Sequence, residues 1–186
     1  FYSYLHHGSC PLQIGFTGTR SMARPVFLLT LLFMLVANAW SGQVTRTKPE
    51  KFSMDGAGAT IDFCYNWSCT DIMDVRLDKK LLDKVTKKIN RCATSAEQEL
   101  LAIRNAIRDI ENQILADHEI LTGDIAGNEY DLYQKGKMDC VDNSSNTNVM
   151  LHVLQKHKKF KYWTVDAPVG DDVFRPHWTA TLKTKD

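Results

Sequence analysis

The chain has 186 residues, 44% hydrophobic and 24% charged, a composition typical of one globular domain with a single core. Lys and Arg (23) nearly balance Asp and Glu (22), which excludes the strongly basic character of general nucleic-acid-binding proteins and of proteins that bind anionic membranes through charge. Every acidic residue lies beyond position 45, so the beginning of the chain differs in kind from the rest.

Residues 22–41 have the three parts of a secretory signal peptide. Met22 and Arg24 supply a start and a basic region, and an uncharged apolar run of about 13 residues follows (PVFLLTLLFMLVA). A membrane span needs about 20 apolar residues, whereas the core of a signal needs roughly 7 to 15. The A-x-A pattern that ends at Ala39 predicts cleavage before Trp40, and Ser41-Gly42 is a slightly later option. We therefore expect an exported protein, periplasmic or secreted, with no stable membrane span after cleavage; an uncleaved anchor is the alternative.

Residues 1–21 lack periodicity and begin without Met, which indicates a reading frame that starts upstream of the true start. Loss of residues 1–39 removes two arginines and no acid, so the formal net charge of +1 becomes −1. It also removes Cys10 and leaves Cys64, Cys69, Cys92 and Cys140. An exported compartment permits disulfides, and four cysteines admit three complete pairings or a structural pair beside a special thiol.

The mature chain is predicted to contain an extended linker over 42–62 and a folded domain over 63–186. The linker is polar, contains Pro49 and shows no periodic apolar face. From Asp74 onward, apolar residues at four-residue spacing predict a helix with lysines on its solvated side. The spaced residues are Leu77, Leu81, Val85 and Ile89.

A second helix is predicted from the Thr94-x-x-Glu97 capping box to about Asp117. Its apolar stripe is expected to lie in the core and consists of Leu100, Ile103, Ile107, Ile110 and Ile114. A loop from Thr122 to Met138 follows.

A third helix is predicted to begin at, or just after, Cys140, because residues 143–147 (NSSNT) favour helix starts and an apolar face follows them. Strands are expected over 160–165 and 177–182, with a loop over 167–176 between them. In the last strand, alternation places His177, Thr179 and Thr181 on one face and Trp178, Ala180 and Leu182 on the other.

Cys140 is the candidate nucleophile, because the N–H groups and positive dipole end at a helix start favour a thiolate. His177 is the first residue of a predicted strand, 37 positions after Cys140. A cysteine at a helix start followed by a histidine on a strand is an arrangement in which the two side chains can meet in one cleft. Negative charge on Asp139 and Asp142 would disfavour the thiolate of Cys140, unless both carboxylates point away from the thiol or are hydrogen-bonded elsewhere. The alternative is a buried or bridged Cys140 and a His177 satisfied within a sheet.

Cys64 and Cys69 are spaced C-x4-C, which fits a local disulfide, two buried thiols or half of a metal site. Cys92 is a competing disulfide partner. A zinc site needs further ligands at suitable spacing, and the sequence near this pair provides none. No metal or cofactor is predicted.

Five segments resemble a group of uncharacterised exported bacterial proteins, which is itself similar to the transglutaminase-like, papain-type cysteine hydrolases. The segments are 63–69 (FCYNWSC), 95–107 (SAEQELLAIRNAI), 122–124 (TGD), 136–147 (GKMDCVDNSSNT) and 176–180 (PHWTA). The resemblance covers about residues 63–182. It implies an α+β fold with a papain-like core, in which N-terminal helices and a central Cys-bearing helix pack on a small antiparallel sheet.

The resemblance also implies a cysteine hydrolase or acyltransferase that acts on peptide or amide bonds, with Cys140 as nucleophile and His177 as general base. A peptide or protein is the expected substrate. Such folds use a third residue, usually an Asp on the next strand, and nothing here matches it, so the domain and its sheet are expected to be truncated after Asp186. A non-catalytic periplasmic binding or assembly protein that retains the fold is the rival hypothesis, and a structural domain with all four cysteines paired is a weaker one.

Overall fold

A computed structural model describes residues 43–45, 51–124, 134–171 and 177–185. The predicted extension 1–21 and signal peptide 22–41 lie outside these ranges. The described residues form an α+β fold with three helices, two antiparallel sheets of three strands and one short parallel pair. The α+β class predicted from the sequence is therefore confirmed at this level.

The first sheet has the order β2-β3-β4 and is antiparallel throughout. Its strands are β2 (Phe52–Asp55), β3 (Gly58–Tyr65) and β4 (Asp71–Asp78). Much of the segment expected to be a linker thus lies in a sheet, because Ala59, Ile61 and Phe63 alternate toward the core. The prediction of a helix from Asp74 is wrong for residues 74–78, which belong to β4. Val75 and Leu77 are buried there, with the two-residue alternation of a strand.

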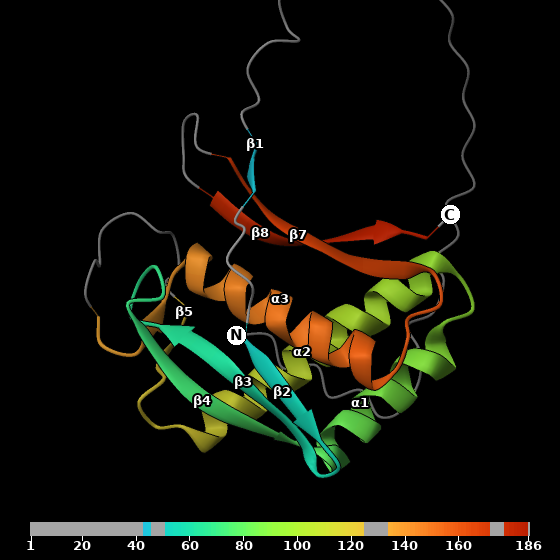
Figure 1. The fold of residues 1–186 in the computed structure, drawn as a ribbon, viewed down its shortest axis with the longest axis horizontal. Coiled ribbons are helices and arrows are strands. Elements are labelled where there is room, and N and C mark those ends of the chain that lie inside the picture. The colour runs from blue at the N-terminus through green and yellow to red at the C-terminus, as the bar shows by residue number, and fades with distance from the viewer. Residues whose placement is uncertain (1–42, 46–50, 125–133, 172–176, 186) are drawn as a thin grey trace, which may run out of the picture.

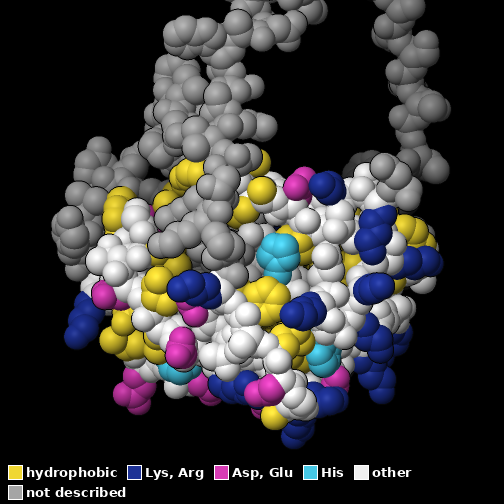
Figure 2. Space-filling model, viewed as in Figure 1, with side chains coloured by type: hydrophobic (Ala, Val, Ile, Leu, Met, Phe, Trp, Pro, Cys, Tyr) yellow, Lys and Arg dark blue, Asp and Glu magenta, His cyan; other side chains and the backbone are white. Residues whose placement is uncertain are grey.

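Helix α1 (Lys79–Cys92) begins where the side chain of Asp78 accepts a hydrogen bond from Leu81 N at 2.6 Å. The predicted solvated face is confirmed, since the five lysines of this helix are exposed. Figure 2 shows Lys and Arg side chains gathered on the side of the molecule where α1 lies in Figure 1.

Helix α2 (Ala96–Asp117) ends at the predicted residue but begins one residue later than the capping box indicated. Ser95, not Thr94, is the N-cap and accepts from Gln98 N at 3.2 Å. The predicted isoleucine stripe is buried, whereas Leu100 is exposed.

Helix α3 (Cys140–His157) lies between the two larger sheets and contacts strands of both (Figure 1). The second sheet has the order β1-β7-β8, made of β1 (Gln43–Thr45), β7 (Trp163–Asp171) and β8 (His177–Thr184). The apolar face predicted for α3 is buried and consists of Val149, Met150, Val153 and Leu154. The core is therefore built around this helix.

Strand β7 corrects the sequence prediction at both ends, since it begins at Trp163 and continues through residues expected to form a loop. It pairs with β8 across an irregularity between Asp166 and Val169, which allows the strand to pass Pro168. Residues 172–176 lie outside the described ranges.

The start of β7 is held against α2 by Glu99, a carboxylate with a relative exposure of 1%. Its two oxygens accept hydrogen bonds from the backbone N–H groups of Lys161 and Tyr162, both at 2.6 Å. Trp163 Nε1 also donates to Ala96 O at 2.7 Å. These contacts fix the strand that follows α3 to the first turn of α2.

The parallel pair β5 (Gly123–Asp124) and β6 (Lys137–Met138) flanks residues 125–133, which the structure does not describe. Strand β6 leads directly into α3 and so positions the start of that helix. Within the described ranges, no helix combines the length and apolar character needed to cross a bilayer.

Candidate functional site around Cys140

Cys140 is the first residue of α3, as the sequence predicted. Asp139 is the N-cap, and its Oδ1 accepts from Asp142 N at 2.9 Å. In return, Asp142 Oδ2 accepts from Asp139 N at 3.1 Å, which completes a reciprocal capping box. The thiol is thus held at the positive end of the helix dipole, between two acidic residues that cap the helix.

The turn from Asn66 to Cys69 has an unusual backbone. All four residues have positive φ angles, between 55° and 63°, and none is glycine. The left-handed conformation costs a non-glycine residue roughly 1–2 kcal/mol, and Asn somewhat less. Four such residues in succession persist only where surrounding contacts hold them.

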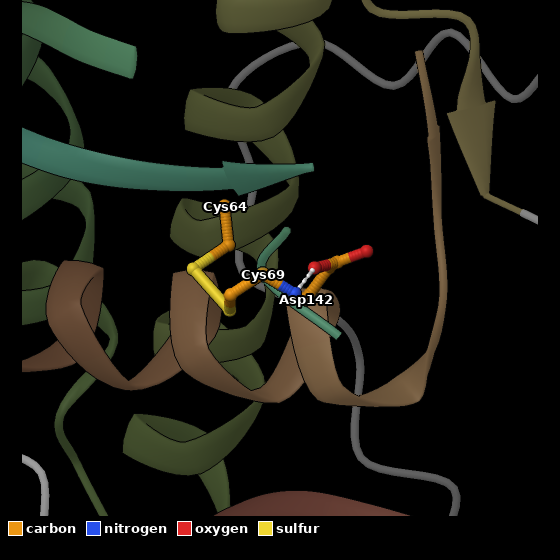
Figure 3. A group of neighbouring side chains, drawn as sticks. All are labelled: Cys64, Cys69 and Asp142. Atoms are coloured by element: carbon orange, nitrogen blue, oxygen red, sulfur yellow. Dashed lines mark hydrogen bonds between the residues drawn. A yellow bond between two sulfur atoms is a disulfide. The ribbon is translucent and has the colours of Figure 1, made fainter. Parts of the chain in front are cut away.

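The contacts that hold this turn come from the two acids beside Cys140. Ser68 N donates to Asp139 Oδ2 at 3.1 Å, and the Ser68 hydroxyl reaches the same oxygen at 3.3 Å. Cys69 N donates to Asp142 Oδ1 at 2.6 Å, the contact drawn in Figure 3. Each carboxylate therefore uses one oxygen to cap α3 and the other to bind the turn. The condition set from the sequence, that both acids be hydrogen-bonded elsewhere, is met.

Asp142 is fully buried, and burial raises the pKa of its carboxyl to about 6. The neighbouring Asp139 also raises this pKa, while the hydrogen bonds from the backbone of Asp139 and Cys69 lower it. At neutral pH the carboxylate form is favoured and accepts both N–H groups.

Asn146 joins α3 to strand β3 with its side-chain amide. Its Oδ1 accepts from Cys64 N at 2.7 Å, and its Nδ2 donates to Cys64 O at 2.9 Å. Strand β2 pairs with β3 only as far as Ile61, so this backbone edge has no β2 residue beside it. The amide of Asn146 takes the place of a neighbouring strand and fixes the register of the helix against the sheet.

The segment before α3 is attached to the same turn. Asn66 Oδ1 accepts from Gly136 N at 2.6 Å, and Asn66 N donates to Lys137 O at 2.9 Å. Gly136 has φ of 80°, and a Cβ there would lie 1.8 Å from Ile120 O. Only glycine fits this close approach of the backbone.

The structure selects among the alternatives left open for the cysteines. Cys64 and Cys69 form a disulfide, with Cα atoms 4.6 Å apart, so Cys92 is not the partner of either. Cys140 is not in a disulfide and is partly exposed. The hypothesis of a domain with all four of these cysteines paired is therefore wrong.

Cys64, Cys69 and Asp142 offer three ligand atoms within 4.8 Å of one another (Figure 3). In this structure both sulfurs belong to the disulfide, and thiolates rather than disulfides ligate metal ions. The group has the donor set of a metal site only in its reduced form.

His177, the predicted base, is the first residue of β8, and its backbone pairs with Asp171. Its side chain lies outside what the structure describes. Further along β8, Ala180 and Leu182 pack on the core and Thr179 is exposed, so the predicted alternation is confirmed there.

Two further histidines lie on α3, and each contacts a side chain of another element. His152 stacks on Phe52, with ring centroids 6.5 Å apart, and burial lowers its pKa. His157 Nε2 lies 2.9 Å from Asp83 Oδ1 and links the end of α3 to α1. Both residues lie more than three turns along the helix from Cys140.

A groove of about 620 Å³ lies between α2, α3 and the inner face of β8. Thr147 and Leu151 line it from α3, and Arg104 and Arg108 line it from α2. Cys140 is not among the lining residues, so the groove is separate from the candidate site.

Sequence reasoning identified Cys140 but missed the turn of residues 66–69 and the amide of Asn146. The Asp139-x-x-Asp142 spacing is itself a capping signature and could have shown that these acids are hydrogen-bonded to the backbone.

No protein family, curated protein or solved structure was found to match the sequence.

Proposed function

We propose that the chain is an exported cysteine hydrolase or acyltransferase of the transglutaminase-like type, which acts on peptide or amide bonds through Cys140 and His177. The observation that carries the proposal is the thiol of Cys140 at the first residue of α3, outside any disulfide, with both neighbouring carboxylates bound to backbone N–H groups. A central helix that bears the cysteine and packs between sheets supports a papain-like core. The Cys64–Cys69 disulfide is compatible with export.

In this reaction the sulfur of Cys140 attacks the carbonyl carbon of the substrate, and His177 accepts the thiol proton. The C–N bond then breaks, and His177 returns the proton to the leaving amine. Backbone N–H groups at the start of α3 supply part of the oxyanion site. Water or a second amine completes the cycle by taking the acyl group from sulfur.

The test is alkylation of the native protein by iodoacetamide near neutral pH, with the labelled residue identified by peptide mass spectrometry. Cys140 should be labelled rapidly, and His177→Ala should slow labelling by about a hundredfold, the lower end of the range for removing a positioned base. His157→Ala is the matched control, since His157 binds Asp83 at the far end of α3. Slow labelling at one rate in all three proteins rejects the Cys-His pair.

One observation favours a second candidate, a non-catalytic binding or assembly protein. Asp139 and Asp142 lie on either side of Cys140 in the sequence, and both are buried. Negative charge beside a thiol disfavours the thiolate that a nucleophile needs. The alkylation experiment separates the two candidates, because only the enzyme requires His177 for the reactivity of Cys140.

A further inference from the structure

The turn of residues 66–69 and the start of α3 form one hydrogen-bonded unit. The disulfide closes the turn, and the N–H groups of Ser68 and Cys69 bind the two acids on either side of Cys140. The same acids cap the helix on which the thiol lies. A change in the turn must therefore alter the surroundings of the thiol.

We propose that the disulfide-closed turn is a positioning element for the thiol of Cys140, and that Asp139 and Asp142 are the positioning residues through which it acts. The catalytic meaning of this role rests on the function proposed above. The turn neutralises part of the charge of each carboxylate by N–H donation and fixes where that charge lies. Reactivity at Cys140 consequently depends on whether Cys64 and Cys69 are joined.

The physical reason is the cost of the turn's backbone. Four left-handed residues carry an intrinsic penalty of roughly 4–8 kcal/mol in total, so the turn relaxes once its closure is lost. Relaxation withdraws the N–H groups of Ser68 and Cys69 from the carboxylates. Two unscreened negative charges beside the thiol then disfavour the thiolate.

A simple charge argument predicts the opposite result for Asp142→Asn. If Asp142 acted only as a nearby negative charge, its removal would favour the thiolate and speed alkylation. In our proposal the asparagine offers one acceptor where two N–H groups need one each, so either the cap or the turn is released. The side chain of Asp139 remains beside the thiol, and alkylation slows.

The experiment measures the rate of iodoacetamide labelling at Cys140 between pH 5 and 9 in four proteins. They are the unaltered chain, Cys64→Ser/Cys69→Ser, Asp142→Asn and the control Glu99→Gln. Glu99 is a buried carboxylate that also accepts two backbone N–H groups, but these belong to residues beyond the other end of α3. Glu99→Gln therefore reports the effect of lost stability alone.

We expect the double serine variant to react about tenfold more slowly at pH 7, with the pH midpoint of labelling raised by about one unit, since one unit corresponds to a tenfold change in thiolate fraction at fixed pH. Asp142→Asn should shift the midpoint in the same direction, and Glu99→Gln should leave it unchanged. The Asp142→Asn arm still decides the matter if the double variant fails to fold.

The outcomes distinguish this proposal from the proposed function. Rapid, His177-dependent labelling that the serine and asparagine variants do not change overturns the positioning role and leaves the Cys-His pair intact. Faster labelling in Asp142→Asn overturns it in favour of the simple charge argument. Slow labelling of the unaltered chain rejects the proposed function itself.

Discussion

Asn146 and Asn148 provide a matched test of how α3 is fixed against the first sheet. Both are buried on α3, with relative exposures of 1% and 4%. Asn146 makes two hydrogen bonds to the backbone of Cys64, whereas Asn148 Oδ1 has no hydrogen-bond partner among the described residues. Replacing each by alanine removes the same atoms, so the difference between the variants isolates the hydrogen bonds.

Asn146→Ala leaves a buried N–H and a buried carbonyl of Cys64 unpaired. Each unsatisfied buried group costs about 1–3 kcal/mol, so the variant should lose about 2–6 kcal/mol of unfolding free energy. Asn148→Ala removes an oxygen that is already unpaired, which offsets part of the cost of the lost packing, and should change stability by about 1 kcal/mol or less.

Urea denaturation of both variants, followed by circular dichroism, measures these changes. The expected difference between them is at least about 1 kcal/mol, with Asn146→Ala the less stable. Equal losses would show that the amide of Asn146 does not replace a neighbouring strand, and the account of how α3 is registered on β3 would fail.

Three further predictions concern stability. Glu99→Gln should lower the unfolding free energy by about 2–3 kcal/mol in urea, because an amide has one oxygen for two buried N–H groups; a loss below about 0.5 kcal/mol contradicts this. Ser68→Val should cost about 1–2 kcal/mol despite its exposed position, since φ is 55° there, whereas Ser68→Gly should be tolerated; equal melting temperatures would refute the left-handed turn. Because the pKa of Asp142 is raised from 3.8 to about 6, the folded protein binds more protons than the unfolded chain between these pH values. The free energy of unfolding should therefore fall as the pH rises from about 4 to about 6. Asp142→Asn should flatten this slope when urea denaturation is repeated across the pH range.

The helices show what periodicity can predict. The stripe of α2 and the start of α3 at Cys140 follow from local spacing and capping preferences, which need no knowledge of the partner surface. The strands β2 and β3 were missed because the alternation around Ala59 and Ile61 is short and interrupted by glycines. The helix assigned from Asp74 shows that Leu77 fits both periodicities, and only the pairing of β4 with β3 decides between them.

The candidate site was predicted only in part for a related reason. Cys140 has a local signature, since a cysteine before a run of helix-starting residues is visible in the sequence. The state of Asp139 and Asp142 depends on Ser68 and Cys69, about 70 positions away, and on a backbone conformation that non-glycine residues rarely adopt. No local pattern encodes a contact of this kind.

The proposed reaction requires a covalent acyl intermediate on Cys140, and this intermediate can be captured with a reactive ester. The purified protein is mixed with an N-acylated amino acid 4-nitrophenyl ester, and the release of nitrophenolate is followed on the millisecond-to-second scale. If Cys140 is acylated, about one nitrophenolate per molecule is released in a burst and an acyl mass is found on the peptide that contains Cys140, both lost in Cys140→Ser. Acylation spread over lysines, or a burst that survives in Cys140→Ser, would contradict the claim.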